Sequence, residues 1–268
     1  MIKIKNLHWK YGEKKILEDI NLEIERGKFY SIIGPNGSGK TTLLRNIARI
    51  LEPQKNTILI DNKDIMDFQN KELAKKIASV PQNTEISFDF SCHDIVMMGR
   101  TPYLKRFETE KAEDKIIVRE AMETTNTWEL RNKSINELSG GERQRVIISR
   151  ALAQEPDIIL LDEPISHLDI HHQVRIMDNI KALNQKKKFS VIAVFHDLNL
   201  AAQYSDTLIL LNHGKIISLG KPEEVITKKN IKEVYHMDVY MMKNPTNGKP
   251  HMIVLPTVNK SFSDDINF

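Results

Sequence analysis

The chain has 268 residues, 40% of them hydrophobic and 28% charged, which is ordinary for a folded domain and excludes an intrinsically disordered one. The formal net charge of +3 is spread along the chain, and the basic run Lys186-Lys187-Lys188 predicts a solvated loop rather than a nucleic-acid site. The single Cys92 excludes an intrachain disulfide and a cysteine zinc framework, and with no signal peptide or bilayer-length apolar stretch we expect a soluble or peripheral protein.

The first predicted elements are strands that lead to a glycine loop. Alternating apolar residues predict half-buried antiparallel strands at Ile2 to Trp9 and Ile20 to Ile24, and a near-continuous apolar run predicts a buried strand from Phe29. Residues 34–41 then match G-x-x-x-x-G-K-[ST] in full, and 41–48 have helical spacing. Strand, glycine loop and helix in this order favour a phosphate site over a simple connecting turn, because the helix N-terminus presents unpaired N–H groups.

In such a loop, glycines let backbone N–H groups surround phosphate oxygens, a lysine reaches the terminal phosphates, and a hydroxyl helps to hold Mg²⁺. The predicted nucleotide-binding residues of this loop are Gly34, Pro35, Asn36, Gly37, Ser38, Gly39, Lys40, Thr41 and Thr42.

Further strands are predicted on either side of a helical block. No strand signal occurs between Asn83 and Glu137, where Glu110 to Glu123 has helical spacing. Asn212-His213-Gly214 predicts a tight hairpin, and the strand pair that it joins is expected at a sheet edge. The remaining predicted strands are Asn56 to Ile60, Ile77 to Val80, Ile158 to Leu161, Ser190 to Phe195, Thr207 to Leu211 and Lys215 to Leu219.

A second candidate phosphate surface lies at Ser139-Gly140-Gly141-Glu142. Serine and glutamate at this spacing form a capping box for a helix that continues from Arg143 until Pro156 ends it. A cap does not explain two consecutive glycines, which weaken a helix start unless a ligand must approach the backbone closely.

Asp162 and Glu163 directly follow an apolar strand. Asp162 is predicted to hold the Mg²⁺ shell, as the strand-end aspartate of P-loop NTPases does, and Glu163 to orient the attacking water. Without the glycine loop, an ordinary acidic pair at the end of a strand would be the better interpretation.

Together these motifs resemble the ATP-binding subunit of ABC (ATP-binding cassette) transporters over nearly the whole chain. By this resemblance Tyr11 stacks on adenine, Gln82 contacts Mg²⁺ and water, and Asp169 belongs to the D-loop. His196 would contact the γ-phosphate and Glu163, and Ser139 to Glu142 of one subunit would close over the ATP held by Lys40 of another. Taken singly, Tyr11 is more often a packing residue, Gln82 a turn residue and His196 a strand-end residue. The cofactors implied are ATP and Mg²⁺, with Thr41, Gln82 and Asp162 near the metal.

More specific strings are similar to the importer ATPases for iron-siderophore, haem and cobalamin complexes. They are residues 98–103, 166–173, 195–202, 220–227 and 245–250. The implied partners are a second ATP-binding subunit, with a homodimer expected, membrane permease subunits and indirectly a substrate-binding protein, at the cytoplasmic face of the membrane. Zinc or manganese import and a soluble, non-transport ABC ATPase are the alternatives. His167, His171 and His172 are interpreted as D-loop and helix residues rather than a metal site, because adjacent residues on a helix point in different directions.

The resemblance implies an α/β fold with a P-loop NTPase core, an antiparallel β subdomain and an inserted helical subdomain. One ABC domain is expected over residues 1–268, with 1–82 and 157–220 forming the core and β subdomain, 83–156 the helical subdomain, and 221–268 a C-terminal extension whose last residues are frayed. Asn56 and Asn62 replace glycines that are common in the family, and asparagine tolerates the left-handed backbone expected there. Ile165 replaces a small or hydroxyl residue, which puts the packing of the D-loop in question.

Overall fold

The computed structural model of the protein describes residues 2–82, 86, 88–106, 108–166 and 168–256. At its centre is a six-stranded sheet in the order β10-β9-β3-β8-β7-β6, in which all neighbours except β9 and β10 are parallel. The strands are β3 (Phe29–Ile33), β6 (Ile77–Val80), β7 (Ile158–Asp162), β8 (Ser190–Val194), β9 (Thr207–Asn212) and β10 (Lys215–Gly220). The predicted hairpin and its edge position are therefore confirmed.

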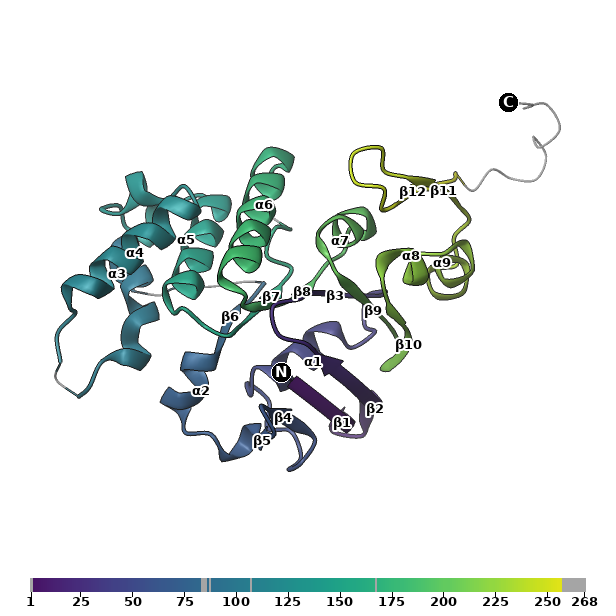
Figure 1. Ribbon diagram of the computed structural model, residues 1–268, viewed down its shortest axis with the longest axis horizontal. Coiled ribbons are helices and arrows are strands. Elements are labelled where there is room, and N and C mark those ends of the chain that lie inside the picture. The colour runs from purple at the N-terminus through teal and green to yellow at the C-terminus, as the bar shows by residue number, and fades with distance from the viewer. Residues whose placement is uncertain (1, 83–85, 87, 107, 167, 257–268) are drawn as a thin grey trace.

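An antiparallel sheet packs against one face of the central sheet (Figure 1). Its order is β2-β1-β4-β5, and the antiparallel pairing of β1 with β2 confirms the prediction for the two alternating N-terminal segments. Asn56 (φ 64°) and Asn62 (φ 66°) adopt the predicted left-handed backbone in the turns around β4. The strands are β1 (Ile2–Tyr11), β2 (Lys14–Ile24), β4 (Ile58–Ile60) and β5 (Lys63–Asp64), followed by a 3-10 turn η1 (Ile65–Asp67).

Two hydrophobic cores form because alternate residues of the central strands point to opposite faces. On one face, Ile32, Leu160 and Ile192 pack with α1 (Lys40–Ile47) and the antiparallel sheet. On the other face, apolar side chains pack with α6 (Ile170–Lys187), α7 (Leu198–Tyr204) and the helical block. Near-continuous apolar strands are required for this double coverage, which is why the sequence predicts them well.

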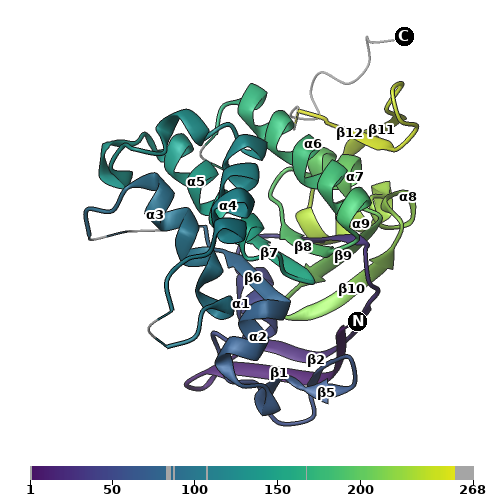
Figure 2. The ribbon, with the colours of Figure 1, turned by 60° about the vertical axis from the view of Figure 1, so that its left-hand side comes forward.

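The block between β6 and β7 is helical in its described residues and lies to one side of the sheet, as Figure 2 shows. Its elements are α3 (Cys92–Met97), η2 (Met98–Tyr103), α4 (Ala112–Thr124), η3 (Trp128–Leu130), η4 (Ile135–Glu137) and α5 (Gly140–Ala153). An ion pair ties the block together, because buried Arg100 donates from Nε to Asp114 Oδ1 at 2.8 Å and from Nη1 to the carbonyl of Ala153 at 2.8 Å.

The C-terminal part adds elements that the sequence does not predict. They are α8 (Pro222–Val225), α9 (Lys228–Tyr235) and a separate hairpin of β11 (Val239–Lys243) and β12 (Pro250–Val254). The helix α2 (Asn70–Lys76) precedes β6.

Lys186 and Lys187 are the last residues of α6, with Lys188 as its left-handed C-cap, so the basic triplet ends a helix instead of forming a loop. No helix in the described ranges has the length and apolar character needed to cross a bilayer. The final residues expected to be frayed lie outside the described part.

Candidate functional site

The predicted site residues meet at the carboxyl ends of four neighbouring parallel strands. The glycine loop follows β3, His196 lies just beyond β8, Asp162 ends β7, and Gln82 lies just beyond β6. Since the strand order is β3-β8-β7-β6, residues from four distant parts of the sequence are brought to one edge. Ligands of open α/β sheets bind at this edge.

The glycine loop closes around its own lysine. Gly39 caps α1 with a φ of 105°, and the Lys40 ammonium donates to the carbonyl oxygens of Gly34 and Pro35, both at 2.9 Å. Burial lowers the pKa of Lys40, and the carboxylates of Glu163 and Asp162 oppose that shift. The buried hydroxyl of Ser38 has no hydrogen-bond partner within the described structure. The loop therefore holds a cation and an unpaired hydroxyl at the start of a helix, both of which suit phosphate oxygens.

Thr41 and Asp162 form the link between the loop and β7. The Thr41 hydroxyl donates to Asp162 Oδ1 at 3.1 Å, and both side chains supply the oxygen ligands that Mg²⁺ prefers. Burial raises the pKa of Asp162, while the hydrogen bond from Thr41 lowers it. A nearby divalent cation would favour the ionised carboxylate, so the pair fits a metal site on its donor chemistry.

Glu163 is held between two other predicted catalytic residues. Gln82 Nε2 donates to Glu163 Oε2 at 2.6 Å, and His196 Nε2 lies 2.5 Å from Glu163 Oε1. Glu163 has a left-handed backbone, with a φ of 50°, which is unusual for a residue with a side chain and recurs at functional sites. A pocket of about 340 Å³ opens beside Glu163 and His196. The carboxylate is therefore fixed in direction and borders open space.

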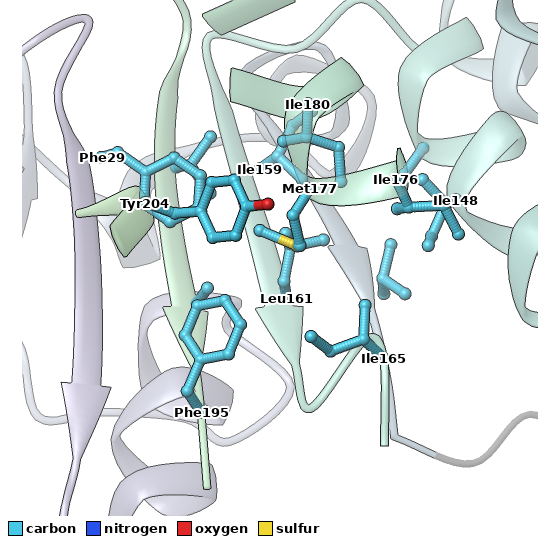
Figure 3. Close-up of a cluster of buried hydrophobic side chains, with 14 of the residues drawn as sticks. Phe29, Ile148, Ile159, Leu161, Ile165, Ile176, Met177, Ile180, Phe195 and Tyr204 are labelled. Atoms are coloured by element: carbon cyan, nitrogen blue, oxygen red, sulfur yellow. The ribbon is translucent and has the colours of Figure 1, made fainter. Parts of the chain in front are cut away.

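Apolar anchors fix the two loops that carry these residues. Figure 3 shows the side chains of Ile165 and Phe195 in the buried cluster around Leu161 and Met177. Ile165 follows Glu163 by two positions and Phe195 directly precedes His196, so each polar residue stands next to a core residue. Ile165 is 5% exposed, so its large side chain packs in the core and anchors the loop that follows β7.

The other predicted nucleotide contacts form no hydrogen bond or ion pair with this cluster among the described residues. Ser139 caps α5 in the predicted capping box, in which its backbone N–H donates to Glu142 Oε2 at 3.0 Å and lowers the pKa of that carboxyl. Within the described residues, no hydrogen bond or ion pair joins Ser139, Gly140, Gly141 or Glu142 to the glycine loop. Tyr11 is 47% exposed at the end of β1, with its ring edge-on to Trp9.

The side chains of Asp169, His171 and His172 lie closer to one another than neighbouring positions on a helix predict. Ligand atoms of Asp169, His171 and His172 lie within 4.8 Å of one another, and the two rings meet edge to face at 5.4 Å. Asp169 is the N-cap of α6 and accepts from the backbone N–H of His172, and its carboxylate also faces His172 Nδ1 at 2.9 Å. Helix capping accounts for this arrangement. His167 lies outside the described residues.

Two contacts to the site were not predicted. The Tyr235 side chain of α9 lies near the backbone of Gly34, which opposes the effect of burial, and burial raises the pKa of Tyr235. Asp197, directly after His196, caps α7 by accepting from the N–H groups of Asn199 and Leu200. An aspartate before an apolar helix is a recognisable capping signal, whereas nothing local in the sequence indicates the Tyr235 contact.

Comparison with known proteins agrees with this geometry. The family model for ABC transporters matches residues 17–166. The ferric enterobactin transport ATP-binding protein of Escherichia coli is 38% identical over 245 residues, which cover 91% of this chain and 90% of that protein.

Two solved structures have the same fold. One is described as an inward-facing conformation of a metal-chelate type ABC transporter, with a TM-score of 0.81 and 27% identity, and the match covers 95% of this chain and 97% of that one. The other is a dimeric ATP-binding cassette in a post-hydrolysis state with bound ADP and Pi, with a TM-score of 0.73 and 33% identity over 83% of this chain and 99% of that one.

Proposed function

This chain belongs to the ABC transporter family, and on that premise we propose that it is the ATP-hydrolysing subunit of an importer for an iron-siderophore, haem or cobalamin complex. The observation that carries the proposal is the polar cluster of Gln82, Glu163 and His196 beside the glycine loop. The transported complex is inferred from the ferric enterobactin and metal-chelate transport of the similar proteins.

The residues present fit ATP and Mg²⁺. The Ser38 hydroxyl without a partner and the Lys40 ammonium would bind phosphate oxygens, and Thr41, Asp162 and Gln82 would hold the metal. When bound, Mg²⁺ supplies neutralisation of phosphate charge, which phosphoryl transfer needs more than covalent help. Glu163 orients the attacking water and takes or shares its proton, while His196 and Gln82 hold the Glu163 carboxylate in place.

We also propose that two subunits build each complete site. Among the described residues, Ser139 to Glu142 form no hydrogen bond or ion pair with the glycine loop of the same chain, and in the proposed arrangement a second subunit brings its α5 N-terminus to the nucleotide. The dimeric cassette among the similar structures supports this arrangement. One chain carries one set of each motif, which favours a homodimer.

The proposed permease contact is the start of the helical block. Phe88, Phe90 and Met98 are large apolar side chains with exposed fractions of 70%, 38% and 40%, in the segment that follows Gln82. Apolar groups of this size on a surface favour a protein partner, and the position next to Gln82 would transmit closure of the site. In this proposal the subunit is peripheral at the cytoplasmic face of the membrane, with a substrate-binding protein as an indirect partner. The domain division predicted from the sequence, with 83–156 as the moving helical subdomain, is part of the proposal.

The test is ATP hydrolysis by the wild type and by Glu163→Gln after co-expression with candidate permease subunits, with and without the loaded binding protein. Turnover that rises with loaded binding protein and disappears in the variant is the expected result. Robust turnover without permease association would contradict the import function and favour a soluble ABC ATPase.

Tyr11→Ala is expected to raise the KM for ATP about 5- to 150-fold while kcat stays close to wild type, because stacking on a base contributes about 1–3 kcal/mol. Tyr11→Trp keeps an aromatic face and should retain wild-type KM. The measurement is initial rate against ATP concentration for the three proteins. An unchanged KM in Tyr11→Ala would assign Tyr11 to packing against Trp9 instead.

A further inference from the structure

The C-terminal hairpin is bonded to α7 through one asparagine. Asn199 Nδ2 donates to the carbonyl of Met252 at 3.0 Å, and the N–H of Met252 donates back to Asn199 Oδ1 at 2.8 Å. This two-way bond joins the first turn of α7 to the middle of β12, more than fifty positions away in the sequence, and Figure 2 shows the hairpin next to α7. Asn199 thus ties the start of α7 to β12 through two hydrogen bonds in opposite directions.

Lys249 holds the other end of the same helix. Its ammonium donates to the carbonyl oxygens of Gln203 at 3.1 Å and Ser205 at 2.6 Å, where α7 ends. A cation is favourable at this place because the carbonyl end of a helix carries partial negative charge. Because the lysine is half-buried, its contact with the helix end is partly shielded from solvent. The same burial lowers the pKa of Lys249.

The helix that the hairpin holds begins directly after the His196 loop. α7 starts at Leu198, and only Phe195, His196 and Asp197 separate it from the end of β8. A helix of seven residues is too short to be stable by itself, so its position depends on tertiary contacts. Tyr204 at the end of α7 also donates to Asp178 Oδ1 of α6 at 2.9 Å. Because only Asp197 lies between His196 and α7, a shift of α7 would move the backbone that carries the 2.5 Å contact of His196 with Glu163.

We propose that Asn199 and Lys249 are positioning residues for hydrolysis: through them the β11–β12 hairpin fixes α7 and thereby keeps His196 in contact with Glu163. The inference rests on the proposed roles of His196 and Glu163. A hydrogen bond weakens steeply with distance, and a misplacement of about 1 Å at a reacting group can cost on the order of 100-fold in rate. The C-terminal hairpin is therefore part of the hydrolytic machinery and not only an appendage of the fold.

The test measures kcat and KM for ATP in the full-length chain for Asn199→Ala and Lys249→Met. Both variants are expected to lower kcat about tenfold with KM within about twofold, because the nucleotide-binding residues stay in place while His196 moves. Lys249→Arg keeps the charge and should restore most of the rate. Met242→Ala is the matched control. Met242 is exposed on the same hairpin, and within the described residues its side chain makes no hydrogen bond to α7.

A double-mutant cycle separates positioning from general stability. His196→Ala is expected to lower kcat by itself, and Asn199→Ala added to it should lower kcat no further, because the residue to be positioned is gone. Melting temperatures of all variants are measured alongside. Additive losses, or a lower melting temperature with an unchanged kcat, would overturn the inference and leave the proposed function intact. An unchanged kcat in His196→Ala would overturn both.

Discussion

Glu163→Gln is expected to lower ATP turnover by about 10²–10⁴-fold while the affinity for ATP is retained, because removing a general base has an effect of this size. Glutamine has the same shape as glutamate, so the contact with Gln82 is preserved and the loop keeps its conformation. What is lost is the negative charge and the ability to take a proton from water. Binding without hydrolysis should also accumulate an ATP-bound dimer, since closure is no longer followed by reopening.

The measurement combines phosphate release with size analysis in the presence of ATP and Mg²⁺. The matched control is Glu129→Gln, which removes the same charge from a side chain that is 91% exposed in the helical block. That control should behave as wild type in both assays. A monomer under conditions where ATP is bound and intact would contradict the two-subunit site, and unchanged turnover would remove Glu163 from its proposed role.

The local motifs predicted the glycine loop, Asp162 and Glu163 at strand ends, whereas Gln82 and His196 came from the family resemblance. Gln82, Asp162 and His196 were assigned to different loops, and the parallel sheet brings these loops to one edge. The contact of Glu163 with His196 followed only from the family resemblance, and its hydrogen bond with Gln82 was not predicted. Spacing alone contains no information about which strands become neighbours.

The fold was predicted best where strands are covered on both faces and least well where they are irregular. Predicted and observed bounds agree closely for β7 and β8, whose apolar runs are continuous. The first half of β2 was missed, since register shifts in its pairing with β1 and the left-handed backbone of Asp19 (φ 53°) interrupt the alternation of apolar residues. A prediction based on a period of two fails at such bulges.

The C-terminal hairpin escaped prediction for a different reason. β11 and β12 pair only with each other, and they are held by packing of Val239 and Met252 on the core and by bonds to Asn199 and the carbonyl end of α7. Isolated two-stranded hairpins are marginal in water, so the tertiary contact and not the local sequence decides whether this one forms.

Gly34→Ala is expected to destabilise the protein by about 1–3 kcal/mol, the usual cost of overpacking a closed site, and to abolish nucleotide binding. A Cβ at Gly34 would lie 2.0 Å from the carbonyl oxygen of Leu211 and 2.8 Å from Ser38 Oγ, so β9 or the glycine loop has to move. The first glycine is therefore required by the close approach of a neighbouring strand, in addition to the phosphate chemistry that the motif suggests.

Gly37→Ala is the matched variant, because Gly37 also has a positive φ (77°) but a Cβ there meets nothing within 4 Å. Without nucleotide it should show only the strain of its own left-handed backbone, about 1–2 kcal/mol. Thermal unfolding of the nucleotide-free proteins, followed by a titration with an ATP analogue, compares the two variants. Equal losses of stability would contradict a clash at Gly34, whereas a larger loss in Gly34→Ala is expected from its φ of 151° together with the close carbonyl of Leu211.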